Sequence, residues 1–121
     1  MRVGVVESPP WVTHTGGEPG GVEVELVRGF ARTLGATPEW HWGADERHME
    51  ALEHFQLDLA IGNLDSKTPW ANKVGLTRPY FEDHVMAVPP GENAWLKRLS
   101  EYLFAQKRNV QGLLQTAAVH P

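Results

Sequence analysis

The chain is 121 residues long, with a formal net charge of −4 and 41% hydrophobic residues, a composition typical of one globular domain with its own core. The acidic balance and the scattered placement of its 11 lysines and arginines exclude a nucleic-acid-binding surface, because phosphate contacts need clustered positive charge. The absence of cysteine excludes disulfides, a thiol nucleophile and cysteine-based zinc sites, and no apolar run approaches the ~20 residues that span a bilayer.

The first part of the chain predicts a strand, an exposed turn and a helix. Residues 2–6 (RVGVV) form a β-branched run that is stopped by Ser8-Pro9-Pro10, which predicts a first strand followed by a loop. Residues 14–21 hold four glycines and a proline and predict a hairpin-like turn. From 22 to 34 apolar residues recur at three- and four-residue spacing, which predicts a helix with Gly35 as its stop.

The next elements continue the alternation of strands and helices. Residues 38–42 alternate as a second strand does, 46–55 carry apolar residues at helical spacing, and 57–62 (LDLAIG) read as a strand covered on both faces. The order strand, helix, strand, helix, strand predicts right-handed crossovers and a mostly parallel sheet with helices on both faces. The fold class is therefore α/β, a three-layer α/β/α domain.

The last third of the chain predicts two short strands and a helical segment. One strand ends at Pro79-Tyr80, another covers residues 84–88, and a run of prolines and glycine follows. Residues 93–118 predict one or two helices that dock on the sheet through one face, formed first by Trp95, Leu96, Leu99, Leu103 and Phe104. In such a fold ligands bind at the carboxyl ends of the strands, which points to the loops 7–11 and 63–70.

Residues 58–80 (DLAIGNLDSKTPWANKVGLTRPY) resemble a segment of type 2 periplasmic solute-binding proteins, the family that serves amino-acid ABC importers. That segment has an Asp-Leu strand, a ligand-contacting loop, Thr-Pro-x-Arg and then Phe-Ser-x-Pro-Tyr. Three further pieces match in order: RVGVVESPPW, GGVEVELVRGFARTLG with Glu23 and Glu25 at aspartate positions, and VPPGENAWLKRLSEYL. The resemblance covers nearly the whole chain.

The resemblance implies a single lobe spanning residues 1–121, with 1–88 as its N-terminal part and 89–121 as its C-terminal helical segment. Family members usually run to about twice this length, with a second lobe inserted after the Pro-Tyr strand. Here the two pieces of lobe one meet near residues 81–88, and a natural deletion and an engineered one would look identical. Because the family's cleft closes on the ligand from two sides, one lobe alone is expected to bind weakly unless a homodimer, formed by exchange of a strand or helix, rebuilds the cleft.

Trp70 stands where the resemblance places an arginine that clamps an α-carboxylate. An indole cannot form that bidentate contact, but its face stacks on rings and cations. Trp11 and Trp70 together would suit an aromatic, apolar or cationic solute, with Asp65 as a counter-charge; alternatively, Trp70 only packs in its turn.

We therefore expect non-enzymatic binding of a small, amino-acid-like, aromatic or cationic solute, without a cofactor or metal. The expected ligand-binding residues are Glu7, Trp11, Gly62, Asn63, Asp65, Thr68 and Trp70. The resemblance implies an ABC permease as a possible partner and a periplasmic or extracellular location after removal of a leader, or a cytoplasmic one if Met1 is the native start. The alternative is a protein-interaction or regulatory module, or a truncated scaffold, derived from this lobe.

Two kinds of chemistry are set aside. Ser8, Ser66 and Ser100 lie in no nucleophile motif, and a dehydratase built on Glu7 and Asp65, as in some relatives with this fold, would need an enclosed site. The group His48, Glu50 and His54 matches no zinc spacing and predicts a solvated helix surface.

Overall fold

A computed structural model describes residues 1–119, with the side chains of 117–119 outside the description. The strands are β1 (Arg2–Val5), β2 (Thr13–Thr15), β3 (Glu18–Gly20), β4 (Glu39–Trp42), β5 (Leu59–Ile61), β6 (Gly75–Leu76) and β7 (Ala87–Val88). The helices are α1 (Val22–Thr33), α2 (Asp45–Glu53), α3 (Asn93–Ala105) and α4 (Lys107–Val119). The last two residues of the predicted C-terminal segment 89–121 lie outside the described part.

Five strands form one central sheet in the order β4-β1-β5-β7-β6. β1 pairs in parallel with β4 and β5, whereas β7 runs antiparallel to both of its neighbours, so β6 points the same way as β5. The predicted mostly parallel sheet is confirmed. The glycine-rich stretch forms the separate β2-β3 hairpin that was predicted as a turn.

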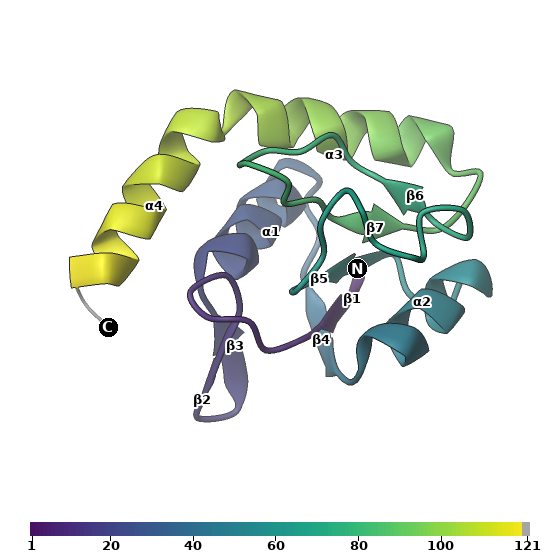
Figure 1. The fold of residues 1–121 in the computed structure, drawn as a ribbon, viewed down its shortest axis with the longest axis horizontal. Coiled ribbons are helices and arrows are strands. Elements are labelled where there is room, and N and C mark those ends of the chain that lie inside the picture. Colours follow the sequence, from purple (N-terminus) through teal and green to yellow (C-terminus); the bar gives the residue numbers. More distant parts are fainter. Residues whose placement is uncertain (120–121) are drawn as a thin grey trace.

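Helices cover both faces of the sheet, which confirms the three-layer architecture. Figure 1 shows α3 along one side of the molecule and α4 continuing from it beside α1, while α2 lies on the opposite side. Because side chains alternate along a strand, Leu59 and Ile61 join the core cluster under α1 and α3, and Ala60 joins the cluster with Met49 and Leu52 of α2. None of the helices within residues 1–119 combines the length and the apolar character needed to cross a bilayer.

The backbone of a loop caps the start of α1. Gly21 offers no capping side chain, and the N–H groups of Val22 and Glu23 donate instead to the carbonyls of Pro10 and Trp11, at 3.1 and 2.9 Å. Free N–H groups at a helix start need such partners. The loop after β1 is thereby held against the first turn of α1.

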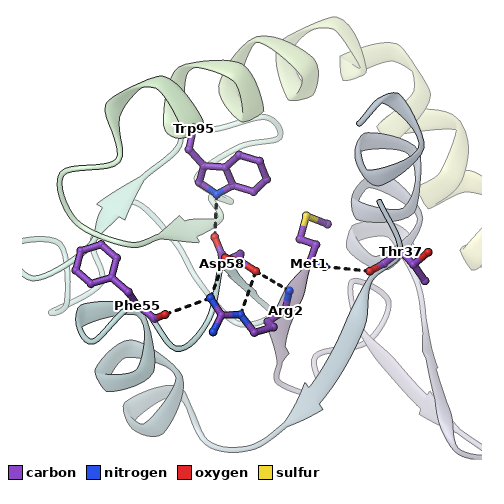
Figure 2. A network of polar contacts seen from close by, with 6 residues as sticks. All are labelled: Met1, Arg2, Thr37, Phe55, Asp58 and Trp95. Atoms are coloured by element: carbon purple, nitrogen blue, oxygen red, sulfur yellow. Dashed lines mark hydrogen bonds and ion pairs between the residues drawn. The ribbon is translucent and has the colours of Figure 1, made fainter. Parts of the chain in front are cut away.

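A polar network ties the amino ends of β1 and β5 to the helices (Figure 2). The Asp58 carboxylate accepts hydrogen bonds from the backbone N–H of Arg2 at 2.8 Å and from its guanidinium at 3.1 and 3.3 Å, and Trp95 Nε1 donates to the Asp58 carbonyl at 2.9 Å. Burial opposes ionisation of Asp58, but the contacts with Arg2 outweigh it and lower the pKa of the carboxyl. This network lies at the end of the sheet opposite to the predicted ligand loops.

Four sequence predictions need correction. The strand expected over 84–88 is confined to Ala87–Val88, because His84 turns back to pair with Phe81. Phe104 does not share the buried face of α3 but is 63% exposed, and Phe55 lies beyond the end of α2 with a φ of 58° and is 51% exposed. Apolar spacing alone did not reveal where each helix turns away from the sheet.

His48 is the fourth correction, since it is buried rather than solvated. Its Nε2 lies 3.1 Å from the Val5 carbonyl oxygen, and its ring packs on the Cα of Gly4, where any added Cβ would overlap it. Burial lowers the pKa of His48, so the neutral imidazole donates from Nε2. Glu50 and His54 are exposed as expected.

Candidate binding site at the carboxyl edge of the sheet

The two predicted ligand loops meet where β1 and β5 end. The N–H of Val6 donates to the carbonyl of Ile61 at 3.1 Å, which carries the strand pairing one step beyond β1. Gly62 follows with a φ of 99°, and a Cβ at this position would overlap the Val6 carbonyl oxygen. Only glycine allows the two loops to approach this closely.

Trp11 is the centre of an aromatic cluster at this edge. Its ring stacks on His84 at a centroid distance of 3.9 Å, lies 5.5 Å from Phe81 and meets Tyr80 edge-on at 6.4 Å. The indole is only 8% exposed because these side chains cover it. The cluster joins the loop after β1 to the segment that follows β6.

Glu23 lies fully buried in the first turn of α1 and is linked to the same cluster. The Tyr80 hydroxyl donates a hydrogen bond to Glu23 Oε2, while Oε1 has no protein partner among the described residues. Burial raises the pKa of Glu23 to about 8, and the nearby backbone of Gly62 opposes that rise only in part. At neutral pH this side chain is therefore mainly a protonated acid.

The side chains of the loop after β5 largely stabilise the loop itself. Asp65 Oδ1 accepts a hydrogen bond from the N–H of Lys67 at 2.8 Å, and Thr68 Oγ1 accepts one from the N–H of Trp70 at 3.5 Å. The N–H of Ser66 donates to the Asp83 carbonyl at 2.9 Å, which fixes this loop to the segment before β7. Asn63 is exposed with a φ of 58°.

Trp70 lies apart from Trp11. It packs against the core cluster on the α2 face of the sheet, whereas Trp11 belongs to the cluster on the α1 face. Lys73 Nζ lies 5.6 Å from the centroid of the Trp70 ring. The structure therefore does not bring the two indoles together, and it favours the packing interpretation of Trp70.

The edge carries exposed negative charge. Glu7 projects from the loop after β1, and Asp65, Glu82 and Asp83 lie near His84. Burial lowers the pKa of His84 even though these three carboxylates act in the opposite direction, so the imidazole is neutral at pH 7. An aromatic cluster beside carboxylates that make no ion pair within residues 1–119 is an environment that favours a cation.

Sequence reasoning missed His84 and Phe81, and it treated Glu23 only as a family position. The alternation in HVMAV hid His84 within an expected strand, although the charged pair Glu82-Asp83 before it is typical of a turn.

A groove of about 680 Å³ lies elsewhere, between β6 and α3, and none of its lining residues belongs to the two ligand loops. Within residues 1–119 no three histidine, aspartate or glutamate side chains are placed to hold a metal ion.

Solved structures share this fold at low identity. The arginine-bound form of domain 1 from TmArgBP is 21% identical with a TM-score of 0.78, covering 87% of this chain and 91% of that one. A Salmonella typhimurium periplasmic binding protein with high arginine specificity is 8% identical with a TM-score of 0.85, covering 95% and 97%. An ancestral amino-acid-binding protein, a precursor of cyclohexadienyl dehydratase, is 13% identical with a TM-score of 0.83, covering 96% and 93%.

Comparison with curated proteins found no match. The family model for bacterial extracellular solute-binding proteins, family 3, matches residues 1–117. That match spans β1, both ligand loops, the sheet and most of α4. The chain thus belongs to family 3 of the bacterial extracellular solute-binding proteins.

Proposed function

We propose that this chain is one solute-binding lobe that binds a small cationic amino acid of the arginine type, without catalysis, at the carboxyl edge of its sheet. The observation that carries the proposal is the meeting of the loops after β1 and β5 beside Trp11 and the exposed carboxylates of Glu7 and Asp65. Family membership supports solute binding. Two of the solved structures with this fold are described as bound to arginine or specific for it.

The charges and aromatic rings at the edge favour the cationic end of such a solute. A guanidinium or ammonium group is attracted both by carboxylates and by an aromatic face. Because His84 and Phe81 cover Trp11, a solute that stacks on the indole must displace one of them. Trp70 supplies no charge for an α-carboxylate, so we expect the side-chain end of the solute to contribute most of the binding.

Weak affinity is expected because a lobe contacts a solute from one side. Halving a binding free energy of about −8 kcal/mol leaves about −4 kcal/mol, which corresponds to a dissociation constant of about 1 mM. A homodimer that presents two such edges to one solute would bind more tightly.

We further infer an ABC permease as partner and a periplasmic or extracellular location, both from membership of an extracellular solute-binding family.

Titration of the ¹⁵N-labelled protein with L-arginine tests this proposal. We expect the Trp11 indole N–H and the Gly62 and Asn63 amides to shift, with little response to L-glutamate at the same concentration. Neutralising the edge in the double variant Glu7→Gln/Asp65→Asn should weaken arginine binding roughly tenfold, since each exposed carboxylate contributes up to about 1 kcal/mol.

The matched control is Glu46→Gln/Glu50→Gln, which removes the same charge from two exposed positions on α2. It should leave the arginine titration nearly unchanged. An absence of localised shifts up to about 10 mM arginine, or equal responses to arginine and glutamate, would contradict the proposal.

A further inference from the structure

A groove of about 680 Å³ runs between the edge strand β6 and α3. Leu76 and Leu96 provide apolar side chains inside it, and Phe104 lines it as the most exposed large apolar side chain of the described residues, at 63%. One patch thus holds both an apolar hollow and an apolar projection. This combination is what a self-complementary surface requires, because in a two-fold contact each patch meets its own copy.

The charges around the groove also occur in both signs. Arg78 makes no ion pair within residues 1–119, and Glu101 has only a loose contact with Lys97 at 4.0 Å, between side chains that are 68% and 78% exposed. Such an exposed pair contributes little to stability. Arg78 and Glu101 are therefore both available to a partner, and in a two-fold contact each one meets its opposite charge on the other copy.

β6 adds a third feature to the same patch. It is the last strand of the sheet and pairs only with β7 among the described strands. The outer backbone groups of an edge strand can pair with a second strand, and two identical edges pair in antiparallel fashion around a two-fold axis. Leu76 of β6 lines the groove together with Arg78, Leu96, Glu101 and Phe104, so the edge strand borders the same patch.

We infer that this patch, defined by Leu76, Arg78, Leu96, Glu101 and Phe104, is the interface of a homodimer with two-fold symmetry. Phe104 of each copy enters the groove of the other, and Arg78 of each copy pairs with the other's Glu101. None of these residues belongs to the loops after β1 and β5 that form the proposed solute site. We expect the dimer to be reversible, so that its fraction rises with protein concentration.

Light scattering after size exclusion over a range of protein concentrations tests this inference with Phe104→Ser. Truncating an anchor side chain at the centre of an interface should weaken association at least tenfold. Phe55→Ser is the matched control, because Phe55 is also an exposed phenylalanine, at 51%, but lies beyond α2 and outside the groove. We expect Phe55→Ser to dimerise like the wild type, and circular dichroism should show both variants folded.

A charge reversal tests the pairing itself. Arg78→Glu and Glu101→Arg should each weaken the dimer, and the double variant, which restores opposite charges, should recover most of the association. A chain that stays monomeric at all concentrations would overturn the inference. A dimer that survives Phe104→Ser and dilution would overturn it too, since an exchange of segments between copies persists without this patch. Arginine titrations of the Phe104→Ser variant should match the wild type, which separates this test from that of the solute site.

Discussion

Replacing Gly62 by alanine is expected to destabilise the fold by several kcal/mol. Gly62 has a φ of 99°, which non-glycine residues rarely adopt, and a Cβ would overlap the backbone carbonyl oxygen of Val6. The obstacle is backbone that is itself fixed by the bond from Val6 to Ile61, so no side-chain rotation can relieve it. Urea denaturation measures the loss, which we expect to exceed about 3 kcal/mol.

Gly35→Ala separates the two causes. Gly35 also has a positive φ, 66°, but nothing lies within 4 Å of the added Cβ. This control should therefore cost only about 1 kcal/mol, the price of the backbone conformation alone. Equal losses for the two variants would show that the approach of the two loops is looser than the structure indicates.

The second large effect is a pH-dependent stability caused by Glu23. Its pKa is raised from 4.5 to about 8 in the folded protein because the side chain is fully buried. A raised pKa means that the folded state holds its proton more tightly than the unfolded chain. The stabilisation is complete below about pH 4.5 and is lost as pH rises towards 8. At about 1.4 kcal/mol per pKa unit, the upper limit of the effect is about 5 kcal/mol.

Glu23→Gln isolates this contribution. The glutamine amide is neutral at all pH values, and its oxygen can still accept the hydrogen bond from the Tyr80 hydroxyl. We expect the free energy of unfolding of the variant to rise relative to that of the wild type by about 2 to 4 kcal/mol between pH 5 and pH 8. His48 and His84 also make stability depend on pH, and their lowered pKa values raise stability as pH rises over part of this range. Their contributions are the same in both proteins and cancel in the difference between the two free energies of unfolding.

Chemical denaturation at several pH values provides the measurement. Parallel stability profiles for wild type and variant would mean that water or a partner group already stabilises the Glu23 carboxylate in the folded state. Tyr80→Phe serves as the control, because it removes the hydroxyl that donates a hydrogen bond to Glu23 but keeps the titrating carboxyl group. The pH dependence of stability should therefore remain in this variant.

The sequence by itself determined the alternation of strands and helices, and with it the sheet and the edge where ligands bind. Apolar periodicity is a local signal, and it placed α1, β4 and β5 within a few residues of their observed bounds. Gly62 was also placed correctly at the end of a strand. An apolar run followed by glycine indicates a strand end from neighbouring residues alone, without information about distant contacts.

Only the tertiary structure decided which side chains share the site. In the sequence Trp11 follows β1 and Trp70 follows β5. In the structure they lie on opposite faces of the sheet, because Trp11 packs in the cluster on the α1 face and Trp70 against the cluster on the α2 face. His84 reached Trp11, and Tyr80 reached Glu23 across 57 positions, through contacts that no spacing in the sequence encodes. Burial of His48 and exposure of Phe104 likewise depend on which face of each helix meets the sheet, and that is set by the packing of the whole domain.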